Sequence, residues 1–172
     1  MNNTKSIYYP PGGILIWIII YLELITFGMA ILALAYYGSE ERELFHSSSL
    51  KLNKTIGTIN TILLLTSGFF VAKGIHFFKA TNIKKTLFYF NCAMLGGFGF
   101  LILKSFEYYE KLEAGLHMDY NSFFRFYWLL TGFHFIHVLV GLVILLVITF
   151  SIKKKQTEAS FEDIEASASF WH

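Results

Sequence analysis

The sequence has few charged residues for its length, and it has a single cysteine. Asp, Glu, Lys and Arg make up 15% of its 172 residues, whereas a soluble domain carries roughly a quarter. Cys92 alone excludes an internal disulfide and any zinc or iron–sulfur site built from several cysteines. No basic tract is long enough to hold a nucleic acid against salt. The composition therefore excludes a soluble enzyme, a disulfide-stabilised secreted domain and a nucleic-acid-binding protein.

Apolar and aromatic residues are abundant instead. Hydrophobic residues make up 55% of the chain, and its 19 Phe and 10 Tyr exceed what one small core could bury. Four apolar runs are long enough to cross a bilayer, for which about 20 helical residues suffice. Helix is required because a lone strand in lipid would leave its backbone groups unpaired. The sequence predicts an all-α, polytopic membrane helix bundle that forms one domain over residues 1–172.

The four predicted helices are separated by short polar segments. Their approximate bounds are 13–37, 55–78, 85–105 and 123–151, followed by a polar tail at 156–172. The first run is interpreted as a retained helix, because the apolar part of a signal peptide is usually only about 7–15 residues long. In the tail, apolar residues recur at helical spacing from Phe161 to Trp171. Glycines in the third and fourth helices would let neighbouring helix backbones approach closely; they are Gly96, Gly97, Gly99, Gly132 and Gly141.

The distribution of Lys and Arg between the loops predicts the orientation. The side that holds the N-terminus would carry seven of them, and the opposite side five or six. Short loops rich in Lys and Arg stay in the cytoplasm. We therefore expect a multi-pass protein of the cell's inner (plasma) membrane with a cytoplasmic N-terminus.

Glu23 lies about ten residues into the first helix, roughly 15 Å along it. A carboxylate at that depth is costly unless it is neutral or paired, so Glu23 should face protein and stay protonated. It could relay or buffer protons, or contact a partner subunit. It could equally be a neutral acid whose hydrogen bond serves helix packing alone.

His134 and His137 lie one turn apart in the fourth helix. Two rings on one face could bind a metal or a haem, but they cannot supply both axial ligands of one haem. Hydrogen bonds to other helices are the favoured interpretation, and no metal site is predicted. If the first and fourth helices are antiparallel, Glu23 and His137 lie at similar depth, which predicts a hydrogen bond between them.

Glu107 is expected at the end of the third helix, with Lys104 three residues before it and Lys111 four residues after it. This spacing predicts an interfacial ion pair. The sequence contains no nucleophile–base pair, phosphate-binding loop or redox motif, so we expect no autonomous catalytic activity.

Five segments together resemble the subunit III family of haem–copper oxidases. The segment 124–142 contains T-G-F-H-x-x-H-V-x-x-G-L, and 16–27 is similar to the family's W-I-F-I-x-x-E-x-x-x-F. The segment 60–67 matches N-T-x-x-L-L-x-S, and 96–108 matches G-x-x-F-x-x-x-K-x-x-E-Y. The E-x-x-x-x-x-W-H of 165–172 resembles the start of the family's final helix. The short N-terminus and the helix plan look most like the NorE-type subunits associated with nitric oxide reductase.

The resemblance implies a non-catalytic accessory subunit that stabilises a haem-bearing catalytic subunit and supports its proton uptake. Haem, and copper in some members, would belong to that partner and not to this chain, and bound phospholipid is a further family trait. Glu23 matches the family's buried helix carboxylate, and His134, His137 and Glu107 match its other recurrent polar positions. The polar residues expected at the membrane interface are Lys104, Glu107, Glu165 and His172. Family members continue past Trp171-His172 into another membrane helix. The resemblance therefore implies a five-helix plan of which four helices are present here.

Two other functions remain open on the sequence alone. A small di-histidine membrane cytochrome would use His134 or His137 to bind haem and would carry electrons. A proton channel would be centred on Glu23. An optical spectrum of the purified chain tests the first, and liposome conductance in Glu23→Gln tests the second.

Overall fold

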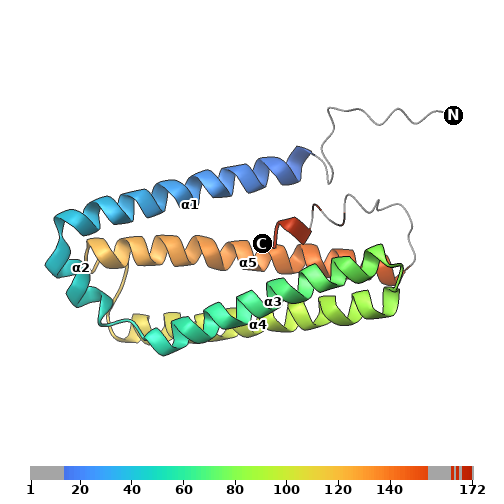
Figure 1. Ribbon diagram of the computed structural model, residues 1–172. Helices are drawn as coiled ribbons and strands as arrows, with labels where there is room; N and C mark the ends of the chain where they lie inside the picture. The colour runs from blue at the N-terminus through green and yellow to red at the C-terminus, as the bar shows by residue number, and fades with distance from the viewer. Residues whose placement is uncertain (1–13, 155–163, 165, 167, 172) are drawn as a thin grey trace.

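The described part of the protein is built from helices alone. The computed structural model describes residues 14–154, 164, 166 and 168–171. Its regular elements are α1 (Ile14–Glu40), α2 (Arg42–Ser49), α3 (Lys54–Lys79), α4 (Ile83–Glu113) and α5 (Ser122–Lys153). Four of them, α1, α3, α4 and α5, are long and apolar enough to cross a membrane. They lie lengthwise beside one another and reverse direction from each to the next (Figure 1). The predicted membrane helix bundle is confirmed.

The predicted helices need two corrections, one to the end of a helix and one to their number. The helix predicted to end near residue 105 continues to Glu113, because the polar residues after Ser105 include Glu107 and Lys111, which are buried and have partners. The short helix α2 was not predicted, since its eight residues are mostly polar. It turns the chain between α1 and α3, and Phe45 in it packs edge-on against Phe123 at the start of α5.

An asparagine side chain caps the start of α3, α4 and α5. Asn53 accepts hydrogen bonds from the backbone N–H groups of residues 55 and 56, Asn82 from that of residue 85, and Asn121 from that of residue 124. Each cap satisfies backbone donors that have no partner inside the helix. These caps place the sharp turns of the chain outside the apolar spans.

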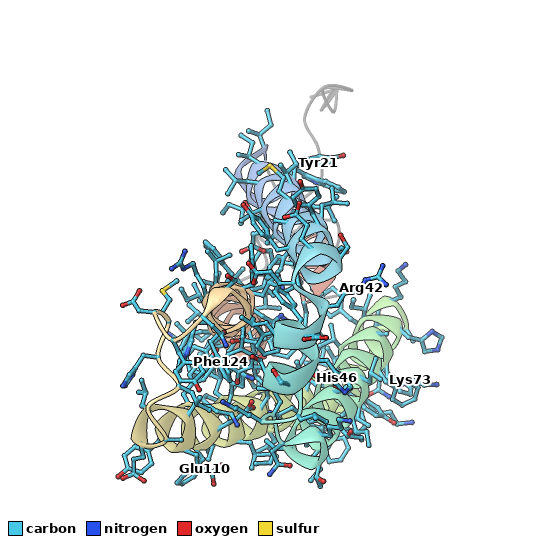
Figure 2. All side chains as sticks on the ribbon, turned by 90° about the vertical axis from the view of Figure 1, so that its left-hand side faces the viewer. Tyr21, Arg42, His46, Lys73, Glu110 and Phe124 are labelled. Atoms are coloured by element: carbon cyan, nitrogen blue, oxygen red, sulfur yellow. The ribbon has the colours of Figure 1, made fainter. Side chains whose placement is uncertain are left out.

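The core lies between α3, α4 and α5. Ser67 of α3 donates a hydrogen bond to the carbonyl of Ala93 in α4 at 2.7 Å. Where Gly74 faces Phe90, a Cβ on the glycine would lie 2.4 Å from the ring, so only glycine permits this approach. The largest fully buried side chains include Phe90, Phe124 and Leu145. Phe124 lies inside the packed body, whereas Lys73 and Glu110 project from its edge (Figure 2).

Helix α1 stands apart from this three-helix body (Figures 1 and 2). It packs against α5 and α2, for example through the Tyr37 and Phe126 rings, whose centroids are 5.4 Å apart. Within the part of the chain that the structure describes, none of its most apolar stretch is buried. Most of the surface of α1 is therefore available to lipid.

The last described residues fold back onto the bundle. Ile164, Ala168 and Phe170 are at most 3% exposed, and Ile164 and Ala168 belong to the same apolar cluster as Val71 and Leu145. In Figure 1 this segment forms the short red helix beside α5. Where it is described, the predicted polar tail is therefore part of the core. Residues 155–163 lie outside the described residues.

Candidate functional site

Glu23 of α1 and His137 of α5 meet between the two helices. His137 Nδ1 is hydrogen bonded to Glu23 Oε2, as their similar depth predicted. Both side chains are partly open, Glu23 at 25% and His137 at 23% exposed. Each stands well inside an apolar helix, where an unpaired polar group is costly. The bond gives each group a partner and joins α1 to the rest of the bundle.

The pair opens onto a groove of about 700 Å³ between α1, α3, α5 and the last described segment. Apolar side chains dominate its walls. Phe170 covers one side of His137, with the two rings stacked at a centroid distance of 4.6 Å. The lining residues are Ile20, Glu23, Leu24, Phe27, Thr61, Leu64, Leu65, Gly68, His134, His137, Val138, Ser169, Phe170 and Trp171.

His134 lies beside His137 and shares the groove. The two imidazole rings are nearly parallel, with centroids 6.3 Å apart. His134 also makes T-shaped ring contacts with Phe27 and Phe100, with centroid distances of 6.2 Å and 5.4 Å. Among the described residues, no three His, Cys, Asp or Glu side chains are grouped closely enough to hold a metal ion. Chemically, this arrangement can hold a proton between a carboxyl group and an imidazole in apolar surroundings.

A second polar cluster joins α4 to α5. Lys104 Nζ lies 3.0 Å from Glu107 Oε2, and the hydroxyl of Tyr127 donates to Glu107 Oε1 at 2.5 Å. Lys104 also donates to the Tyr127 oxygen at 3.3 Å. Lys104 is 8% and Glu107 4% exposed. The predicted ion pair is present, but the expectation that it lies at a helix end is wrong, because α4 continues and α5 packs over the pair.

Lys111, which the sequence places within reach of Glu107, bonds elsewhere. Its ammonium group donates to the backbone carbonyl of Lys51 at 2.7 Å and so ties α4 to the loop before α3. Sequence reasoning did not single out Tyr127, whose hydroxyl group completes this cluster. The available signal was a tyrosine hydroxyl group inside a predicted membrane helix, since such a group requires a partner when it is buried. Glu165 and His172 lie outside the described residues.

The known proteins to which this chain is similar are subunits of oxidases. The family model described as cytochrome c oxidase subunit III matches residues 51–172. A cytochrome c oxidase subunit 3 of Rhipicephalus sanguineus is 32% identical over 121 residues, which cover 68% of this chain and 45% of the relative. A cytochrome bo(3) ubiquinol oxidase subunit 3 of Buchnera aphidicola is 26% identical and aligns with 100% of this chain and 81% of its own length.

A third relative has a composite name. The heme-copper oxidase subunit I+III of Aeropyrum pernix is 30% identical over 132 residues, which cover 74% of this chain and 16% of that protein. The chain spans less than half of the length of the cytochrome c oxidase subunit 3 relatives that it matches. The matched region contains α3, α4 and α5 and therefore His134, His137, Lys104 and Glu107.

Proposed function

This chain belongs to the cytochrome c oxidase subunit III family, and on that premise we propose that it is a non-catalytic accessory subunit of a respiratory terminal oxidoreductase. The observation on which the proposal rests is the family match over residues 51–172, which spans the whole three-helix body. In this role the chain docks on a catalytic subunit and stabilises it. It performs no reaction by itself.

The proposed partner is a haem-bearing catalytic subunit, which holds the haem and, in an oxidase, the copper. The joined name of the Aeropyrum pernix relative, subunit I+III, supports a subunit I as that partner. The resemblance of the helix plan to NorE-type subunits favours a nitric oxide reductase as that partner. An oxygen-reducing oxidase is the alternative within the same proposal.

The chain is a multi-pass membrane protein. We place it in the inner membrane with the start of α1 on the cytoplasmic side, because Lys79, Lys84 and Lys85 gather in the α3–α4 turn on that side. Phospholipid would cover the exposed surface of α1. This orientation puts α2 and the α4–α5 loop on the outer side.

The proposed contribution to proton uptake lies in the Glu23–His137 pair. A carboxyl group bonded to an imidazole can accept a proton on one side and release it on the other without leaving a bare charge in the membrane. The groove beside the pair gives it access to a neighbouring subunit or to water. The pair would therefore buffer protons near the partner's uptake path.

Affinity purification of the tagged chain in a mild detergent tests the proposal. We expect a catalytic subunit to copurify, with a haem spectrum and metal content that belong to that partner, and the complex to consume oxygen or nitric oxide. The chain purified free of partners should show no Soret band and no turnover. A pigment or an activity that stays with the isolated chain would overturn the accessory role and favour a cytochrome.

A comparison of two glutamate variants tests the proposed contribution of the Glu23–His137 pair to proton uptake. In the purified complex, Glu23→Gln should slow proton uptake during turnover, whereas Glu40→Gln should not, because Glu40 is an exposed carboxylate at the far end of the same helix. Equal uptake in both variants would leave the docking role intact and refute the role of the pair.

A further inference from the structure

Trp171 fills a notch between α4 and α5. A Cβ built on Gly97 of α4 would lie 2.6 Å from the Trp171 ring, and one built on Gly141 of α5 would lie 2.8 Å from it. Carbon atoms do not approach this closely, so neither position accepts a side chain while the indole is present. The sequence assigned these two glycines to close contact between helix backbones. The structure shows that the space above them is occupied by a side chain from the last described segment.

Phe170 and Ala168, which are close to Trp171 in sequence, are buried. Phe170 is 3% exposed and stacks on His137, and Ala168 is fully buried. Because residues 170 and 171 are adjacent, the position of the indole in the notch sets where the Phe170 ring stands. Trp171 and Phe170 also form one wall of the groove that contains Glu23 and His137.

We propose that Trp171 is a positioning residue for the Glu23–His137 pair: by seating in the Gly97–Gly141 notch, it holds Phe170 against His137 and closes one side of the groove. Without it, the Phe170 ring loses its support, and the imidazole and the carboxyl group become more accessible from that side. This inference goes beyond the accessory role and does not depend on it, because it concerns only contacts within this chain.

A matched pair of glycine variants in α5 tests whether the contact of Trp171 with the notch holds this segment in place. Gly141→Ala adds one methyl group whose close neighbours are Trp171 and Phe170, so it should displace the segment without disturbing the packing of α5 on α4. Gly132→Ala adds the same methyl group where nothing lies within 4 Å, so it controls for the effect of alanine on the helix. Both variants are studied as the full chain in lipid nanodiscs.

Two measurements report the result. The carboxyl stretching band of Glu23 is obtained as the infrared difference between the chain and Glu23→Gln, and its rate of hydrogen–deuterium exchange is followed. The fluorescence of Trp171 is obtained as the difference from Trp171→Phe, with brominated lipid as the quencher. Gly141→Ala should shift the band, speed its exchange several-fold and increase the quenching, whereas Gly132→Ala should change none of them. Unchanged signals in Gly141→Ala would overturn the inference.

Trp171→Ala provides an independent test, because it removes the indole and adds no atom to any helix. It should shift the Glu23 band in the same direction as Gly141→Ala and speed its exchange. A Trp171→Ala chain that retains its helical circular dichroism and an unchanged Glu23 band would refute the positioning role. A band that shifts in Trp171→Ala but not in Gly141→Ala would refute the notch as its basis.

Discussion

The buried cluster of Lys104, Glu107 and Tyr127 allows a prediction with a worked magnitude. Glu107→Gln removes the only charge that faces Lys104 at 3.0 Å in this cluster and leaves the ammonium group buried. Breaking a buried ion pair by removing one partner costs about 3–5 kcal/mol. Tyr127→Phe removes one hydrogen bond to a charged group, which costs about 1.5–3 kcal/mol. The free energy of unfolding should therefore fall more in Glu107→Gln than in Tyr127→Phe.

Unfolding in mixed micelles with increasing denaturing detergent measures this difference. Trp128 is a suitable fluorescent reporter, since its ring lies 4.7 Å from that of Tyr108 beside the cluster. Ser105→Ala is the control, because its hydroxyl is exposed and bonds only to the carbonyl of Leu101 in its own helix. If Glu107→Gln costs no more than Tyr127→Phe, or no more than the control, the ammonium group is not left buried and the reasoning is wrong.

The double variant Lys104→Met with Glu107→Leu separates charge burial from packing. Replacing a buried ion pair by apolar residues of similar volume is often neutral or stabilising. We expect the double variant to recover most of the stability lost in Glu107→Gln. A loss in the double variant as large as the loss in Glu107→Gln would show instead that the ion pair itself contributes net stability.

Two further predictions concern the contact between α3 and α4. Ser67→Ala removes a hydrogen bond between helices and should cost about 0.6 kcal/mol, whereas Thr66→Ala, whose hydroxyl bonds within its own helix, should cost less; the same unfolding assay compares them. Gly74→Ala should cost about 1–3 kcal/mol because its Cβ would overlap the Phe90 ring. Gly57→Ala, where nothing lies within 4 Å, should be neutral or stabilising, and an equal effect of both glycine changes would contradict the packing argument.

The positions of the membrane helices could be predicted because their signal is thermodynamic and local. A run of about 20 apolar residues must be helical in lipid, whatever its neighbours are. The Glu23–His137 bond was predictable for a similar reason, since polar groups at the same depth of neighbouring apolar helices lower their cost in the membrane by bonding to each other. The end of α4 was not predictable, because Glu107 and Lys111 look like the polar residues that follow a span. Only their partners on α5 and in the loop before α3 reveal that they are buried.

The identity of the side chain that fills the glycine notch was also beyond the sequence. Glycine spacing shows that something approaches closely, but a helix backbone and an indole ring satisfy the same pattern. Trp171 lies 30 residues from Gly141 in sequence, and no periodicity connects them. Long-range contacts of this kind depend on how the chain folds back, which apolar patterning does not specify.

The separation of α1 from the three-helix body makes the chain sensitive to bilayer thickness. Its 27 residues span about 40 Å at 1.5 Å per residue, longer than the roughly 30 Å of hydrocarbon in a typical bilayer. A helix with such a mismatch tilts, and one whose neighbours are mostly acyl chains tilts without repacking a core. The Glu23–His137 bond crosses from this helix to the firmly packed α5. We therefore expect acyl-chain length to change the geometry of that bond.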